Sequence, residues 1–178
     1  MDLLKSIPTG SRVPDMVNVI IEISRNSQNK YEYMERFNVM KLDRVLGAHL
    51  AYPANYGFVP RAWSRDGDPL DALVITHEPV VPGVLIEARP IGMLKMKDSG
   101  KQDNKLLCIA ENDPKFKEVR DISGLTKGTL NEIADFFRIY KKTESINTKV
   151  EGWVNAAEAK KEVMFCIDLY KKKIRGKK

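Results

Sequence analysis

The distribution of apolar residues divides the chain into two parts near residue 114. In the first part, short β-branched and apolar segments alternate with Gly and Pro, a pattern typical of strands joined by turns. The segments that predict strands are 17–23, 30–35, 39–46, 73–76, 84–96 and 105–110. Residues 105–110, KLLCIA, are almost wholly apolar and indicate a buried strand.

In the second part the apolar residues recur with helical spacing. A stripe from Leu130 to Tyr140 predicts an amphipathic helix, and Thr129 is its expected N-cap because Glu132 follows three residues later. A second helix is expected over residues 156–173, capped by Asn155. Strands followed by helices predict an α+β fold, mainly β, in which carboxy-terminal helices pack on a small antiparallel sheet or barrel.

Length and composition add limits to this picture. A chain of 178 residues predicts a single domain over residues 1–178. Its amino terminus is interrupted by Pro8, Gly10 and Pro14, so no signal-peptide segment is expected, and no apolar run is long enough to cross a membrane. The two cysteines form no CxxC pair, which gives no indication of a disulfide framework or zinc site. These features predict a cytoplasmic protein.

The net charge of +6 comes from one end of the chain. Residues 171–178, KKKIRGKK, contain six basic and no acidic side chains, and the rest of the chain carries 24 of each kind. Terminal blocks of like charge are usually solvated, so we expect a mobile basic tail on a neutral body.

A cluster of acidic residues, Arg65-Asp66-Gly67-Asp68-Pro69-Leu70-Asp71, carries the most chemical information. Gly67 and Pro69 favour a tight turn, which brings three carboxylates close together. Crowded carboxylates repel one another unless a cation lies among them, and Mg²⁺ prefers such hard oxygen ligands. A solvated acidic turn is the simpler alternative for a motif this short.

A second acidic loop raises the odds of a metal site. Asp98 follows a predicted strand and Asp103 comes five residues later, although a polar hairpin with Gly100 at its tip also explains this segment. The spacing leaves open whether the two loops meet. Acids beside phosphate-binding groups would make a phosphoryl-transfer site. Cations and phenols recur at Lys30-Tyr31-Glu32, Arg44, Tyr52–Tyr56 and Tyr140-Lys141-Lys142, although strand-surface lysines, interfacial tyrosines and lysines at a helix carboxy terminus would explain them equally.

Over residues 5–170 the chain resembles a soluble family I inorganic pyrophosphatase of the bacterial type. The core of the resemblance is Asp66-Gly67-Asp68-Pro69-Leu70-Asp71-Ala72. Supporting segments are Lys30-Tyr31-Glu32, Tyr52-Pro53-Ala54-Asn55-Tyr56-Gly57, Leu94-Lys95-Met96-Lys97-Asp98 and Val150-Glu151-Gly152-Trp153. The resemblance implies a five-stranded OB-like barrel with flanking carboxy-terminal helices, and an enzyme that hydrolyses pyrophosphate to two orthophosphates.

The resemblance also implies a role for each candidate residue. Asp68 would be the general base that activates water, and Glu22 would support the site from the first strand. The implied metal ligands are Asp66, Asp71, Asp98 and Asp103, and the implied phosphate ligands are Lys30, Arg44, Tyr56, Lys105, Tyr140 and Lys141. Several Mg²⁺ ions would bind, with Mn²⁺ or Zn²⁺ as substitutes. Ser99 stands where many bacterial members carry an acid, so no extra metal contact is expected there.

Bacterial relatives of this length are usually homohexamers, so a homo-oligomer is expected. Two alternatives remain. A nucleic-acid-binding barrel would use the basic tail, but the acids beside the tyrosines would repel a phosphodiester backbone, and we expect neither a nucleic-acid nor a membrane partner. A metal-dependent phosphatase or nucleotide pyrophosphatase acting on larger substrates would use the same residue types.

Overall fold

Five strands close into a barrel in the computed structural model, which describes residues 2–47, 50–141 and 148–175. The hydrogen-bonded order is β1 (Val17–Ile23), β4 (Asn55–Trp63), β5 (Pro69–Ile75), β8 (Lys105–Ala110) and β6 (Leu85–Asp98). Pairing of β6 with β1 closes the ring. Only the β5–β8 pair of this ring is parallel, so the predicted five-stranded barrel is confirmed as a closed mixed barrel.

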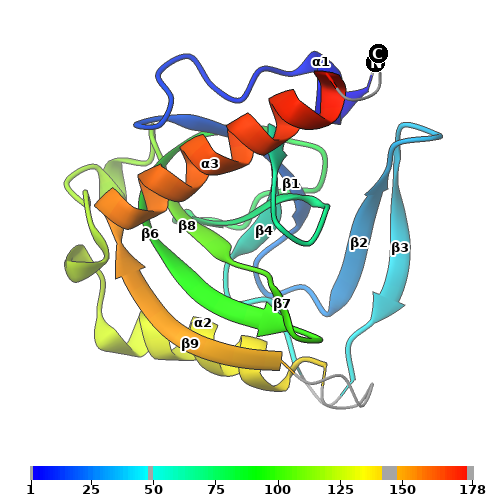
Figure 1. Cartoon of the computed structure of the whole chain (residues 1–178). Coiled ribbons are helices and arrows are strands. Elements are labelled where there is room, and N and C mark those ends of the chain that lie inside the picture. The colour runs from blue at the N-terminus through cyan, green and yellow to red at the C-terminus, as the bar shows by residue number, and fades with distance from the viewer. Residues whose placement is uncertain (1, 48–49, 142–147, 176–178) are drawn as a thin grey trace.

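Four further strands extend this framework. β7 (Lys101–Gln102) and β9 (Thr148–Asn155) both pair with the long strand β6. β2 (Asn29–Met34) and β3 (Val39–Val45) form a separate hairpin that stands beside the barrel (Figure 1). Tyr33 and Met40 of this hairpin pack against Ile20 of β1 and Phe58 of β4.

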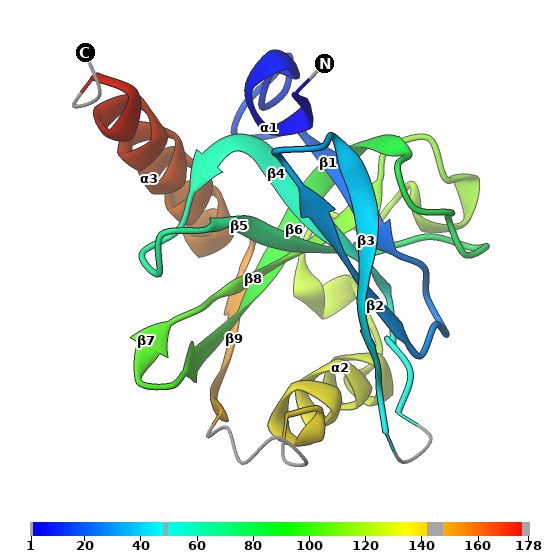
Figure 2. The ribbon, with the colours of Figure 1, turned by 90° about the vertical axis from the view of Figure 1, so that its right-hand side faces the viewer.

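Helices lie on different sides of the barrel. α2 (Lys127–Ile139) lies beside β9, and α3 (Ala156–Arg175) crosses the barrel on another side (Figures 1 and 2). The short elements are α1 (Leu3–Ser6) and the 3₁₀ turns η1 (Pro114–Phe116) and η2 (Ile122–Gly124). None of the helices in the described part of the chain is long and apolar enough to span a membrane.

The barrel strands are buried on both faces, which explains their continuous apolar sequences. On β8, Leu106 packs in the core cluster that includes Val163 of α3, whereas Leu107 packs in the cluster that includes Phe137 of α2. All three neighbouring apolar positions 106–108 have no measurable exposure. The two helices thus cover opposite faces of the same strands.

Three sequence predictions need correction. The segment 55–63 was not predicted as a strand because Gly57 and Pro60 indicated turns, yet both lie within β4. α2 begins earlier than expected, since Thr126 rather than Thr129 is its N-cap and accepts a hydrogen bond from the Thr129 N–H at 3.1 Å. Strand β9 was also missed.

The amino-terminal cap of α3 agrees with prediction. Asn155 Oδ1 accepts a hydrogen bond from the Glu158 N–H at 3.1 Å. At its other end the helix continues to Arg175, so residues 171–175 of the expected mobile tail are helical, and 176–178 lie outside the described residues.

Candidate active site

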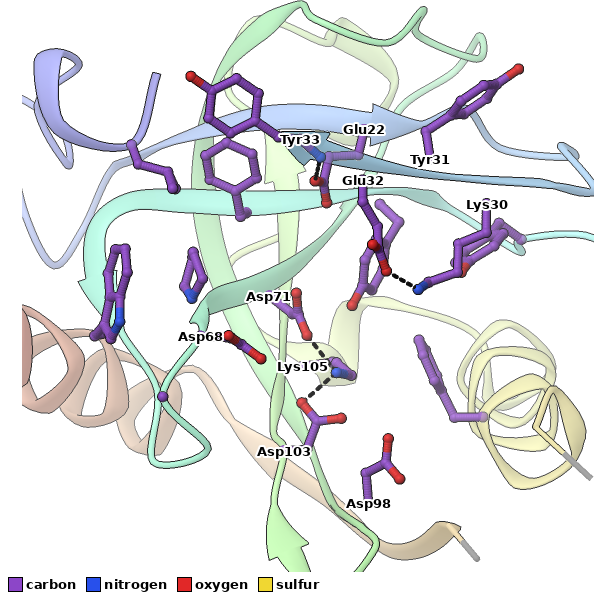
Figure 3. A pocket seen from close by; sticks show the side chains of 18 of the residues that line it. Glu22, Lys30, Tyr31, Glu32, Tyr33, Asp68, Asp71, Asp98, Asp103 and Lys105 are labelled. Carbon is purple, nitrogen blue, oxygen red and sulfur yellow. Dashed lines mark hydrogen bonds and ion pairs between the residues drawn. The ribbon is translucent and has the colours of Figure 1, made fainter. Parts of the chain in front are cut away.

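A cavity of about 600 Å³ opens between the barrel, the β2–β3 hairpin and α2. Carboxylates and amines point into it from several elements (Figure 3). All predicted site residues line this cavity except Asp66 and Arg44; those that do are Lys30, Tyr56, Asp68, Asp71, Asp98, Asp103, Lys105, Tyr140 and Lys141. The two acidic loops do therefore meet, which their sequence spacing left open.

The first acidic loop is a turn held by its own backbone. Ser64 N–H donates to the Asp68 carbonyl at 2.7 Å, and Asp68 N–H donates to Asp66 Oδ1 at 3.0 Å. Gly67 adopts a φ of +101°, which favours glycine. The turn uses the Asp66 side chain as an internal acceptor, while Asp68 and, from β5, Asp71 face the cavity.

The second acidic loop reaches the same cavity through strand pairing. β6 and β7 form a tight hairpin whose turn residues, Ser99 and Gly100, both have positive φ. Ser99 Oγ donates to Asp98 Oδ1 at 3.1 Å, so this residue supports Asp98. The parallel register of β5 and β8 then brings Asp103, which precedes β8, close to Asp71 of β5.

Lys105 lies at the centre of these carboxylates. Its side chain is 2% exposed, and Nζ lies 2.5 Å from both Asp71 Oδ2 and Asp103 Oδ1 (Figure 3). Burial opposes the charge on Lys105, but the two neighbouring carboxylates outweigh it and raise the pKa above its usual value. The lysine is thus held as a buried cation between the two acidic loops.

Burial disfavours the charged form of several carboxylates at the site, and for Asp103 the contact with Lys105 offsets this only in part. Burial raises the pKa of Asp66, Asp68 and Asp103, and neighbouring acidic charges raise each of them further. Burial also raises the pKa of Glu22 to about 8, although the Tyr33 N–H donates to Glu22 Oε1 at 2.7 Å. The site therefore holds more negative charge than its own cations neutralise.

Cations and phenols surround the acids on the hairpin and α2 sides. Lys30 contacts Glu32 and lies 3.1 Å from Asp43 Oδ2, and Lys141 pairs with Asp98. Burial raises the pKa of Tyr140, so this phenol stays neutral and can donate a hydrogen bond.

Tyr56 completes the phenol pair. Burial raises its pKa well above the ordinary value, with acidic charges adding to the effect. Its ring centroid lies 5.9 Å from Lys105 Nζ. An anion entering the cavity would meet both charged amines and neutral hydroxyl donors.

Arg44 and Asp66 are the predicted site residues that do not line the cavity. Arg44 lies on β3 opposite Lys30 and donates from Nη1 to Asp43 Oδ2 at 2.6 Å. Asp66 lies in the same turn as Asp68. Both are adjacent to the cavity wall rather than part of it.

Among the further residues that line the cavity without a predicted role are Glu32, Trp63 and Lys173. Lys173 of α3 donates to the Gly67 carbonyl at 3.2 Å, and its Nζ lies 4.4 Å from the Trp63 ring centroid. Its membership of a terminal run of basic residues indicated a solvated tail. The sequence signal that could have indicated this contact is Ile174, which continues the helical spacing of apolar residues four positions after Tyr170 and so places Lys173 on the helix.

The residue chemistry fits Mg²⁺. Among the described residues no three acidic, His or Cys side chains converge closely enough to hold a metal by themselves. Mg²⁺ commonly binds through one or two carboxylates, waters and substrate phosphates, so an open set of hard oxygen donors is what it requires. Within the part of the chain that the structure describes, Asp66 and Asp68 have no ion-pair partner, and a divalent cation would supply one.

A closed barrel with acids, amines and phenols around one cavity indicates an enzyme of phosphoryl transfer that uses a hard metal ion. Comparison with known proteins makes the class specific, because a model described as inorganic pyrophosphatase matches residues 19–171. The chain belongs to the inorganic pyrophosphatase family. As a member it is classed as an inorganic diphosphatase, a hydrolase.

Individual relatives agree over nearly the whole chain. The inorganic pyrophosphatase of Synechocystis sp. is 44% identical over 166 residues, covering 90% of this chain and 98% of the relative. The crystal structure of inorganic pyrophosphatase from Thermus thermophilus is similar with a TM-score of 0.91 at 40% identity, covering 95% of this chain and 99% of that one. A Zea mays relative named soluble inorganic pyrophosphatase is 41% identical, covering 90% of this chain and 75% of the relative.

Proposed function

We propose that this chain hydrolyses inorganic pyrophosphate to two orthophosphates, using Mg²⁺ and a water activated by Asp68. The observation that carries the proposal is the convergence of two acidic loops, four lysines and several tyrosines in one cavity of about 600 Å³. Membership of the family supports the choice of substrate.

Four aspartates are proposed to hold the metal ions: Asp66, Asp71, Asp98 and Asp103. When bound, several Mg²⁺ ions, or Mn²⁺ or Zn²⁺ in their place, would neutralise phosphate charge and lower the pKa of water. Glu22 lines the same cavity from β1, and a cation bound there would favour the charged form of this carboxyl, whose pKa burial raises to about 8. The carboxylate excess described above supports this assignment.

Positive and hydroxyl groups are proposed to bind the two phosphates: Lys30, Arg44, Tyr56, Lys105, Tyr140 and Lys141. Lys30 and Lys141 reach the cavity from separate walls, so they can contact different ends of a small dianionic or more highly charged substrate. Charged donors placed where negative charge develops on the leaving phosphate would lower the barrier.

Asp68 is proposed as the general base. A water oxygen attacks one phosphorus, the bond from that phosphorus to the bridging oxygen breaks, and the bridging oxygen leaves with the second phosphate. Asp68 takes the proton that the water loses and later releases it to solvent or to a phosphate product. The site supports this role because Asp68 faces the cavity and makes no ion pair with any residue of the described segments.

We further propose that the protein acts in the cytoplasm as a homo-oligomer, a hexamer by family resemblance. Pyrophosphate is the expected small-molecule partner, and neither nucleic acid nor membrane is expected to bind. The measured mass of the purified protein in solution tests the oligomeric part of this proposal.

The Asp68→Asn variant tests the mechanism. We expect turnover of pyrophosphate to fall by roughly 100-fold or more, since general bases contribute on this scale, while Mg²⁺ affinity changes little. Glu118→Gln is the matched control, because the Glu118 side chain is 85% exposed and lies outside the cavity. A loss of most Mg²⁺ binding in Asp68→Asn would instead make Asp68 a metal ligand.

A further inference from the structure

A polar network lies behind the two acidic loops, on the side that faces α3. At its centre is Glu162 of α3, whose side chain is 10% exposed. Glu162 Oε1 accepts hydrogen bonds from Arg65 Nη1 and from Asn104 Nδ2, the latter at 3.2 Å. One carboxylate oxygen thus joins two segments that are distant in sequence.

The positions of its two partners give this contact its importance. Arg65 directly precedes Asp66 in the first acidic loop, and Asn104 directly follows Asp103 in the second. Each partner is one residue from a carboxylate assigned to the metal site. Displacement of either partner would therefore move the backbone that carries a proposed ligand.

Further contacts fix both partners in place. The Arg65 guanidinium lies 3.8 Å from the Phe165 ring centroid, one turn along α3 from Glu162. Asn104 is 4% exposed, and its Oδ1 accepts from Gln102 Nε2 at 2.6 Å. The Arg65 side chain is 40% exposed, so the buried part of the network is the Glu162–Asn104 contact, and a satisfied buried polar contact holds a single geometry.

Glu162 acts from outside the catalytic cavity. Together with Arg65, Asn104 and Phe165 it lines a second cavity of about 420 Å³, which shares no lining residue with the first. Glu162 therefore does not line the cavity proposed to bind substrate, and we expect its influence on the reaction to pass through its two partners.

We propose that Glu162 is a positioning residue that sets the relative placement of the two acidic loops, and so the arrangement of Asp66 and Asp103. This role rests on the proposed function, which gives those aspartates their task. Loss of a partner that orients metal-binding residues typically costs 10–100-fold in metal affinity or activity. Glu162 contacts the residues next to the proposed ligands rather than the ligands themselves. We therefore expect a loss at the lower end of this range, about 10-fold.

The test compares Glu162→Gln and Glu162→Ala with the control Glu158→Gln. Gln keeps the size of the side chain and one acceptor but loses the charge that pairs with Arg65, so it remains informative if the Ala variant does not fold. Glu158 is exposed, lies one turn earlier on α3 and pairs with Lys161 at 2.6 Å. Its replacement should change none of the measured quantities.

Three measurements are made on each variant. Amide hydrogen exchange of residues 64–68 and 102–105 is followed in metal-free protein, Mg²⁺ affinity is measured by calorimetry with MgCl₂ alone, and kcat and KM are measured with pyrophosphate. For the Glu162 variants we expect faster exchange in both segments, an affinity or kcat lowered by about 10-fold, and a smaller change in KM.

The double variant Arg65→Met/Glu162→Gln should lose less than the sum of the two single losses, because both changes break one contact. A Glu162 variant with wild-type exchange in both segments, wild-type Mg²⁺ affinity and wild-type kcat would overturn the proposal, even if its melting temperature fell. A wild-type protein that does not hydrolyse pyrophosphate would refute the proposed function, and exchange and Mg²⁺ affinity would then still decide the role of Glu162.

Discussion

Replacement of Lys105 with Met should destabilise the metal-free protein strongly. Lys105 is 2% exposed and its Nζ lies 2.5 Å from a carboxylate oxygen of both Asp71 and Asp103. Met preserves much of the side-chain length and removes only the charge and its donors. Breaking a buried ion pair by removing one partner costs about 3–5 kcal/mol, because the remaining charge stays buried without compensation.

The exposure of the two carboxylates sets the expected loss within this range. The Asp71 side chain is 24% exposed and that of Asp103 is 11% exposed, so water can replace part of what Asp71 loses. We therefore expect the free energy of unfolding to fall by about 3 kcal/mol. Added Mg²⁺ should restore part of this loss, because a divalent cation supplies charge near the same carboxylates.

Urea unfolding followed by tryptophan fluorescence, with EDTA present and at one fixed protein concentration, measures this free energy. Lys101→Met is the control. Lys101 is exposed on β7 and lies two residues before Asp103 in the sequence rather than pairing with it. A loss below about 1 kcal/mol for Lys105→Met would refute the reasoning, because the buried cation would then be worth no more than an exposed surface pair.

Three further predictions concern packing, pH and thiol chemistry. Gly57→Ala should cost about 1–3 kcal/mol in urea unfolding, because its Cβ would lie 1.9 Å from a carbonyl oxygen of β1; an unchanged midpoint would contradict this close approach. The hydrogen bond from the Ala156 N–H lowers the pKa of Asp121 below 3.8, so the stabilisation by this carboxylate is complete above pH 3.8 and lost as pH falls through the lowered value. In Asp121→Asn this part of the acid dependence of unfolding should disappear, and an unaltered pH profile would count against a stabilising role of this hydrogen bond. Burial raises the pKa of Cys108, and that of Cys166 to about 12, so both thiols should react with a disulfide reagent only after unfolding in urea; rapid labelling of the native protein would show that they are accessible.

The apolar segments separated by Gly and Pro predicted most of the barrel strands, but this pattern failed where backbone packing determined the residue type. Gly57 and Pro60 indicated turns, whereas β4 needs Gly57 because its backbone passes so close to β1. Local propensity contains no information on such an approach, since it depends on a strand that is distant in sequence.

The candidate site shows a similar division between local and long-range information. The turn at Gly67 and the hairpin at Gly100 follow from their own sequences. Their meeting depends on the parallel pairing of β5 with β8, which no short-range pattern encodes. The contact of Lys173 with the Gly67 carbonyl was also missed, because it joins residues 106 positions apart. The basic residues around Lys173 indicated only a solvated segment.

The central claim is that this cavity hydrolyses pyrophosphate with a hard divalent cation. The most direct test is orthophosphate release by the purified wild-type chain from pyrophosphate, ATP and a phosphomonoester, each with and without Mg²⁺. We predict Mg²⁺-dependent release from pyrophosphate that greatly exceeds release from ATP and from the phosphomonoester. Absence of release from pyrophosphate in well-folded protein, or equal rates on all three substrates, would contradict the account.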